Sequence, residues 1–245
     1  MLRIIIFASV FLFSLFPLYA IHGHENIRNA FYQAYINNDV EEISVELDFR
    51  LKSIRENEIT DDILLVEYGL IGYYIGNEKF DKARFLLTRT KLHVSWLQSV
   101  YPENSLYLAL QGASCGFEIG MDWRKAFYLG PGSLELINNS IELNTNSPYG
   151  WIEKANAEYY EPKMLGRREE IAVEYYTKAI YLFEKFQHTK NWMYLNTMVQ
   201  LGKLHTELGN YTKAYEIYSR LLDIEPDFLW VKNELLPKVK NQLKQ

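Results

Sequence analysis

The sequence predicts an all-α fold, a right-handed α-solenoid of stacked antiparallel helix pairs that ends in a C-terminal capping helix. Three observations predict this fold. The chain repeats itself at intervals of about 40 to 47 residues, and its apolar residues recur with the 3.6-residue period of helices. The chain also has 19 Tyr, 13 Phe and 5 Trp but only 7 Pro. This composition is typical of long helices that pack through aromatic rings, and not of a loop-rich β-sandwich.

The composition also excludes several classes of protein. Of the 245 residues, 48% are hydrophobic and 23% are charged, as in a soluble protein with a packed core. A net charge of -5 argues against sequence-independent binding to nucleic acid, whose phosphates favour a basic surface. Cys115 is the single cysteine, so no disulfide can form within the chain. The fold must therefore be held by packing.

Residues 1–20 differ from the rest of the chain. Arg3 precedes an almost entirely apolar stretch, residues 4–16, and Ala20 ends a suitable cleavage region. This pattern predicts a secretory signal peptide and hence an exported, periplasmic or secreted protein. Leu18 stands where a small residue is preferred, so the alternative is an uncleaved N-terminal membrane anchor. Residues 21–245 are expected to form one helical-repeat domain.

The clearest repeat lies at residues 195–228. Its defining positions are Met198, Leu201, Gly202, His205, Ala214, Tyr218 and Pro226. This pattern resembles the tetratricopeptide repeat, a pair of antiparallel helices. Gly202 and Ala214 lack bulk, so the two helices can approach closely while Tyr218 fills the space beside them. One such pair cannot bury its apolar face alone, and stacking on neighbouring pairs completes the core.

Weaker copies of the pattern occupy the rest of the chain. The expected repeats lie near residues 24–55, 64–100, 105–146, 148–187 and 195–228, with a capping helix at 228–245. Gly112 and Ser133 are 21 residues apart and Ala155 and Ala172 are 17 apart, whereas the equivalent spacing in the last repeat is 12. Two consecutive repeats therefore carry insertions, expected as loops, between their helices. In the capping helix, Pro237 is expected to produce a break or a kink.

The resemblance implies that the first helix of each pair lines a concave groove that holds a protein or an extended peptide. The groove residues expected on this basis are Tyr149, Ile152, Asn156, Tyr159, Tyr160, Asn196, Val199, Lys203, Thr206 and Phe117, with Leu106, Ala109 and Ala113 beside them. Asn156 and Asn196 would pair with peptide backbone while the peptide side chains rest on tyrosines. The alternative is that several of these tyrosines pack between helices.

The two insertions form a second candidate site, because stacked repeats should place both on one edge. The expected edge residues are Trp123, Arg124, Lys125, Phe127, Tyr128, Lys163, Arg167 and Arg168. Cations beside aromatic rings can hold a carboxylate, a phosphate or an anionic lipid head group. The alternative, which we favour, is that Glu169 and Glu170 neutralise the two arginines and the rings anchor the loop.

The sequence contains no motif for catalysis, a cofactor or a metal. Gly130-Pro131-Gly132 predicts a turn and not a nucleotide site, and neither a paired-His motif nor a nucleophile elbow is present. His22-Gly23-His24 fits a frayed terminus better than a metal site. Cys115 lies in a segment rich in small residues, where a thiol acts as a small hydrophobe. We therefore expect no enzyme, no cofactor and no metal.

These observations favour a non-enzymatic, exported scaffold that binds a protein or an extended peptide. The alternative is a small-molecule or lipid-binding accessory component of an envelope transport system, suggested by the aromatic groove and the cationic edge. The arrangement of insertions resembles that of exported tetratricopeptide proteins of Bacteroidetes-type bacteria, a resemblance that implies no activity. No nucleic acid is expected as a partner, and membrane contact is expected only if the N-terminal segment is uncleaved.

Overall fold

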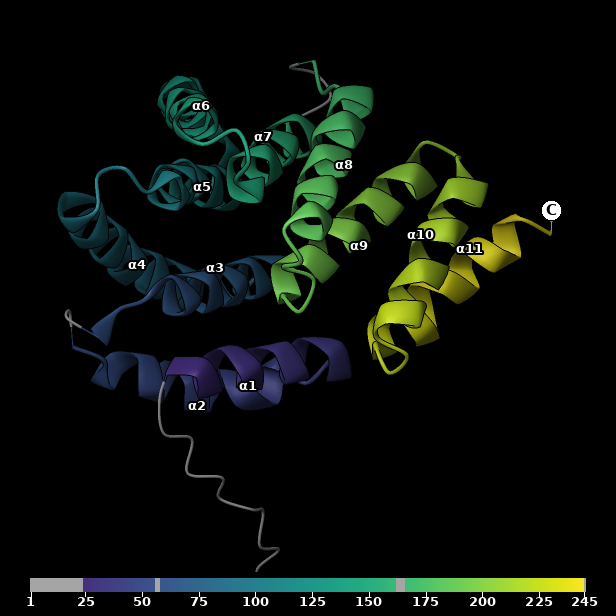
Figure 1. The fold of residues 1–245 in the computed structure, drawn as a ribbon, viewed down its shortest axis with the longest axis horizontal. Helices are drawn as coiled ribbons and strands as arrows, with labels where there is room; N and C mark the ends of the chain where they lie inside the picture. The colour runs from purple at the N-terminus through teal and green to yellow at the C-terminus, as the bar shows by residue number, and fades with distance from the viewer. Residues whose placement is uncertain (1–23, 56–57, 162–165, 245) are drawn as a thin grey trace, which may run out of the picture.

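The computed structural model describes residues 24–55, 58–161 and 166–244, and within these ranges the regular structure is entirely helical. The helices pair in sequence order and follow one another along an arc (Figure 1). The pairs are α1 (His24–Asn37) with α2 (Val40–Ser53), α3 (Asp61–Gly76) with α4 (Phe80–Val100), α5 (Ser105–Met121) with α6 (Ala126–Leu143), α7 (Pro148–Tyr160) with α8 (Glu169–Lys185), and α9 (Trp192–Glu207) with α10 (Tyr211–Ile224). The predicted all-α solenoid is confirmed.

Local sequence sets where several first helices begin. The Thr60 side chain accepts a hydrogen bond from the backbone N–H of Ile63 at the start of α3. The Asn104 side chain does the same at the start of α5, and Asn191 accepts from the Met193 N–H at 2.9 Å at the start of α9. Each cap satisfies an N–H group that has no partner within its own helix.

Small residues let the two helices of a pair approach closely, as the sequence predicts. A Cβ atom added to Gly202 would lie 2.5 Å from the Tyr218 ring, and one added to Gly112 would lie 2.6 Å from Ile137. Ala214 of α10, in the same helix pair as Gly202, is fully buried. The tetratricopeptide spacing therefore marks real points of helix contact, because no larger side chain fits there.

The first insertion is helical, so the loop and the turn predicted for it are wrong. A short 3₁₀ helix, η2 (Trp123–Lys125), leads directly into α6, which runs through Pro131. Ser133 Oγ donates a hydrogen bond to the Gly112 carbonyl oxygen at 2.8 Å, and Ile137 packs against Gly112. These contacts with α5 hold the segment in helical register and outweigh the local turn preference of the glycines and proline. In the second insertion, residues 162–165 lie outside the described residues, and these include Lys163.

After α10 the chain forms the cap, a π-helical segment η4 (Val231–Leu235) followed by α11 (Leu236–Gln242). Pro237 lies in the first turn of α11 and does not end the helix, so the expected break is absent. A π turn contains an extra residue, and it occurs here immediately before the proline, whose ring would clash with a regular preceding turn. Val231, Leu236 and Val239 are buried, which attaches the cap to α10.

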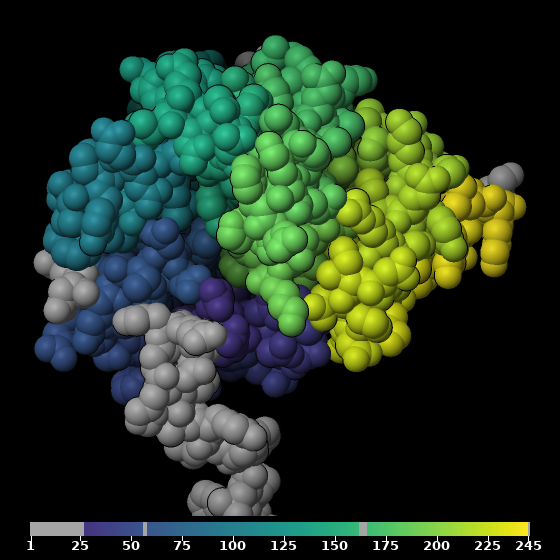
Figure 2. All heavy atoms as spheres, in the orientation of Figure 1, coloured from purple at the N-terminus to yellow at the C-terminus, as the bar shows by residue number. Residues whose placement is uncertain are grey.

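The two ends of the array also contact each other. Phe31 of α1 packs edge-on against Trp192 of α9 with ring centroids 5.1 Å apart. The Tyr35 hydroxyl donates to the Asn196 side-chain oxygen at 3.0 Å, and the Tyr32 hydroxyl donates to Glu225. Figure 2 shows α1 against the C-terminal helices. The solenoid is therefore closed on itself, which the repeat pattern does not predict. Among the described helices, none is long and apolar enough to span a membrane.

We expect Gly202→Ala to lower the free energy of unfolding by about 1–3 kcal/mol, because the added methyl group overpacks the contact with Tyr218. Gly116→Ala is the matched control, since a Cβ there meets nothing within 4 Å. The control should be neutral or more stable by up to about 1 kcal/mol, as Ala is the better helix former. Urea denaturation of both variants measures the difference. Equal stabilities would contradict the close packing at Gly202.

Candidate binding site

The closed array divides the predicted groove residues into two groups. Ile152, Val199 and Tyr159 are buried, as are Leu106, Ala109 and Ala113. The residues that retain solvent exposure are Tyr149, Asn156, Tyr160, Asn196, Lys203, Thr206 and Phe117. Tyr159 therefore packs between helices, whereas the Tyr160 side chain is 62% exposed. The surface available to a partner is smaller and more polar than the sequence predicts.

Amide side chains of α7 and α9 form the centre of this surface. The Asn156 oxygen accepts from the Tyr176 hydroxyl at 2.7 Å, and its nitrogen donates to the Tyr68 hydroxyl at 3.1 Å. On α9, the side-chain oxygen of Gln200 accepts a hydrogen bond from the Tyr160 hydroxyl at 3.2 Å. Gln200 also donates to Asn196, 3.4 Å away. Sequence reasoning missed Gln200, although its position one turn after Asn196 places it on the same helix face. We call the surface formed by Asn156, Tyr160, Asn196 and Gln200 the amide row.

Glu153 of α7 is a buried carboxyl group beside the amide row. Its side chain faces the Tyr68 phenol, and one carboxylate oxygen accepts from Asn156 at 3.2 Å. The residue is only 6% exposed, and burial raises the pKa of its carboxyl group to about 7. The hydrogen bonds from Tyr68 and Asn156 lower the pKa, but by less than burial raises it. No cation pairs with Glu153 among the described residues. Sequence reasoning missed this residue because its Tyr68 partner is far away in the chain.

The Tyr68 phenol that Glu153 faces belongs to a cluster of aromatic side chains. The Tyr68 ring lies 4.9 Å from Phe117 and 6.2 Å from Trp192, centroid to centroid. Burial raises the pKa of the Tyr68 phenol well above its ordinary value. This phenol therefore stays neutral at physiological pH and acts as a hydrogen-bond donor beside the carboxyl group.

The arginines predicted at the edge are paired. Arg167 contacts Glu207 at 2.7 Å and Glu169 at 3.3 Å, and its guanidinium group lies 4.6 Å from the centre of the Tyr159 ring. The Arg168 Nε donates to Glu158 at 2.8 Å. The expected pairing with Glu169 is present for Arg167. Arg168, however, pairs with Glu158 and not with Glu170, because the end of α7 lies beside the start of α8.

The favoured alternative, that the aromatic rings of the first insertion anchor a loop, is wrong. Trp123, Phe127 and Tyr128 are 56 to 70% exposed on η2 and the first turn of α6. The Trp123 and Phe127 ring centroids are 6.3 Å apart. Arg124 contacts Asp122 through two hydrogen bonds of 2.8 and 3.0 Å. This edge thus presents rings to solvent, while the charge of its arginine is paired.

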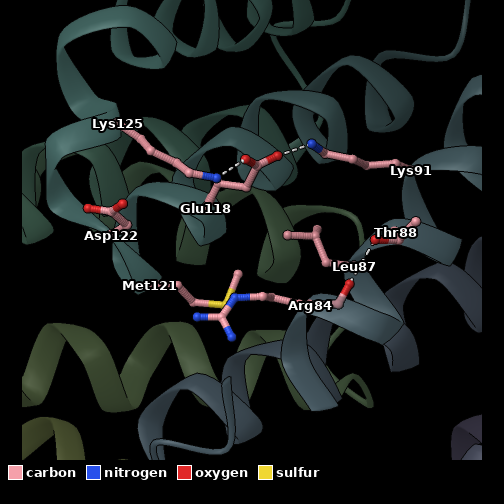
Figure 3. A pocket seen from close by; sticks show the side chains of 8 residues that line it. All are labelled: Arg84, Leu87, Thr88, Lys91, Glu118, Met121, Asp122 and Lys125. Carbon is pink, nitrogen blue, oxygen red and sulfur yellow. Dashed lines mark hydrogen bonds and ion pairs between the residues drawn. The ribbon is translucent and has the colours of Figure 1, made fainter. Parts of the chain in front are cut away.

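Next to this edge, α4 and the end of α5 enclose an open pocket of about 310 Å³ (Figure 3). Lys91 and Lys125 approach the Glu118 carboxylate from two sides, with Lys125 at 2.6 Å, and they hold the pKa of that carboxyl below its ordinary value. Arg84, the third cation in the lining, pairs with Asp81. Every lysine and arginine of the pocket therefore has a carboxylate partner, which weakens the case for an anion site here.

A second pocket, of about 250 Å³, opens at the seam between α1 and α9. Tyr32 and Trp192 line it from the two sides, and Glu225 closes one end through its hydrogen bond from Tyr32. The Trp192 indole N–H is buried and has no hydrogen-bond partner among the described residues. The seam thus contains a buried donor without a partner among the described residues.

The last helix pair matches a known repeat family. The tetratricopeptide repeat model matches residues 195–228, which span most of α9 and all of α10. The chain therefore contains a tetratricopeptide repeat. A similar solved structure, titled "Crystal structure of MamA protein", is 17% identical, with 74% of this chain and 88% of that chain covered and a TM-score of 0.37. The comparison with curated proteins found no match. Tetratricopeptide arrays serve as scaffolds for protein interactions, and their fold is typically non-catalytic.

The raised pKa of Glu153 predicts a pH-dependent stability. Because the folded pKa of about 7 exceeds the ordinary 4.5, the unfolded chain ionises first as pH rises. Glu153 should therefore destabilise the fold progressively between about pH 4.5 and pH 7, by about 3 kcal/mol in total. Glu153→Gln removes this loss, so its stability relative to wild type should rise across that window.

Urea denaturation at pH 5 and pH 8 measures this difference. Glu174→Gln, the same change at an exposed position of α8, is the control and should follow wild type at both pH values. If the free energies of unfolding of Glu153→Gln and wild type differ by the same amount at both pH values, the Glu153 carboxyl has an ordinary pKa and the prediction is wrong.

Proposed function

We propose that this tetratricopeptide-repeat protein is an exported scaffold that binds an extended peptide along the amide row of α7 and α9. The observation that carries the proposal is the exposure of Tyr160 beside Gln200 and Asn196, while the apolar residues of the same helix faces are buried. An exposed ring flanked by amides on rigid helices suits a peptide, which offers both backbone polar groups and side chains.

The hydrogen-bonding capacity of the row supports this partner. A side-chain amide has two donor hydrogens and can accept two hydrogen bonds. Gln200 uses one of each, toward Asn196 and from Tyr160. The remaining donor and acceptor match the alternating N–H and C=O groups of an extended backbone. The Tyr160 hydroxyl can turn from Gln200 to a peptide carbonyl without leaving a buried group unpaired, because its side chain is exposed.

Export is part of the proposal, and it rests on the apolar residues 4–16 and Ala20, which lie outside the described residues. The test is N-terminal sequencing of the protein recovered from the exported fraction. A new N-terminus near residue 21 is expected. An intact residue 1 in the membrane fraction would favour the N-terminal anchor, and recovery from the cytoplasm alone would contradict export.

A small-molecule or lipid ligand is the competing function. The two pockets, of about 310 and 250 Å³, are at or below the lower end of the usual size of ligand sites. A defined ligand that co-purifies and is detected by native mass spectrometry would favour this function over the scaffold.

Partner contact should map to the amide row. A photo-crosslinking amino acid placed at Tyr160 should capture a partner in the native cell, whereas the same substitution at Tyr181 should not. Tyr181 is the matched control because it is an exposed tyrosine of α8. Mass spectrometry identifies the captured chain. Crosslinks that form only from Trp123, Phe127 or Tyr128 would place the partner at the edge instead.

Once the partner is known, Tyr160→Ala and Gln200→Ala should each weaken its binding about tenfold, as expected for a central contact residue. Tyr181→Ala should leave the affinity unchanged. Tyr159 is unsuitable for this test, because it is buried and its hydroxyl bonds Glu207 at 2.6 Å, so its loss would damage the fold.

A further inference from the structure

Glu153 is a buried carboxyl group to which the described residues bring no balancing charge. It lies on α7, and its side chain contacts the neutral Asn156 amide and the neutral Tyr68 phenol. An isolated buried carboxylate is unfavourable, which is why burial raises its pKa to about 7. Other buried glutamates differ in this respect: Glu67 contacts Arg89 at 3.2 Å, and Glu158 contacts Arg168.

Two cations of the neighbouring segments interact with other carboxylates. Arg167 is held by Glu207 and Glu169. Lys203 lies three residues after Gln200 on α9, and its strongest attraction is to Glu207. When ionised, Glu153 therefore carries a negative charge that one cation could neutralise, and none of the described residues supplies that cation.

Neutral phenols from three helices lie near the carboxyl group. The titratable groups that face it are Tyr68 from α3, Tyr160 from α7 and Tyr176 from α8, while Phe117 of α5 packs on Tyr68. No charged group of α5, α6 or α9 acts on Glu153 within the described part of the chain. Aromatic faces attract cations, and this attraction is largest where water is excluded.

We propose that Glu153 and the tyrosines around it bind the ammonium or guanidinium group of a basic side chain, so that the amide row selects a peptide segment containing Lys or Arg. This inference rests on the proposed peptide-binding function. The side chain enters past the exposed Tyr160 and the half-buried Asn156. Its charged nitrogen replaces the Asn156 amide as the donor to the carboxylate, and its aliphatic stem lies along the rings.

Binding of such a cation requires the ionised carboxylate and stabilises it. Because the carboxyl pKa in the free protein is about 7, binding at pH 6 must release a proton, whereas binding at pH 8 releases none. Affinity for a basic peptide should therefore rise about tenfold from pH 6 to pH 8 and level off above that. A peptide that does not use Glu153 should show no such dependence.

The first experiment selects ligands from a phage-displayed library of random dodecapeptides on the full-length protein. The expected result is a set of peptides that lose binding to Tyr160→Ala and that share one Lys or Arg at a fixed position. Peptides that depend on Tyr160 but share no basic residue would overturn the cation site and leave the proposed function standing. A selection that yields no Tyr160-dependent peptide would count against both.

The second experiment measures the affinity of one selected peptide by isothermal titration calorimetry at pH 6 and pH 8. Glu153→Gln should weaken binding at pH 8 at least tenfold and abolish the pH dependence, whereas the exposed control Glu174→Gln should behave as wild type. Replacing the shared basic residue of the peptide by norleucine should have the same effect on wild type, without any change to the protein. Unchanged affinity in either case would overturn the proposal.

Discussion

The packing of α1 against α9 around Trp192 gives the helical array its closed form. The Trp192 ring contacts Phe31, Tyr35 and Tyr68, at centroid distances of 5.1, 5.9 and 6.2 Å, and so joins three first helices at one point. A tetratricopeptide array that stayed open would expose these rings along its inner face. Because the array closes, they become core, and the exposed part of α7 and α9 is mainly a polar strip.

Closure also explains why the inner face contains so many paired phenols and amides. Buried polar groups must find partners, and the chain from Tyr68 through Asn156 to Tyr176 connects α3, α7 and α8 by hydrogen bonds of 3.1 and 2.7 Å. Glu153 is joined to this network but has no cationic partner in the part of the chain that the structure describes. The same network that specifies how the helices stack therefore keeps one carboxyl group in a position where an incoming cation would be stabilised.

Features that depend on neighbouring residues were predictable from the sequence. The helix pair at residues 195–228 followed from the small residues Gly202 and Ala214, because their contacts lie within one hairpin. Helical stretches elsewhere followed from the apolar period. The turn expected at Gly130-Pro131-Gly132 was wrong, because contacts of the following residues with α5 override local turn preference. The partner of Arg168 was also misassigned, since Glu158 approaches it only once α7 and α8 are in place.

The all-α class, the repeat in α9 and α10 and the small residues at helix contacts could be predicted, because each arises within one helix pair and its period. Packing between distant helices explains why the array closes, why Tyr159 is buried while Tyr160 is exposed, and why none of the described cations pairs with Glu153. Those outcomes depend on residues up to 193 positions apart, as in the contact of Tyr32 with Glu225. Periodicity reports which face of a helix is apolar, but the curvature of the whole stack decides which of those faces meet.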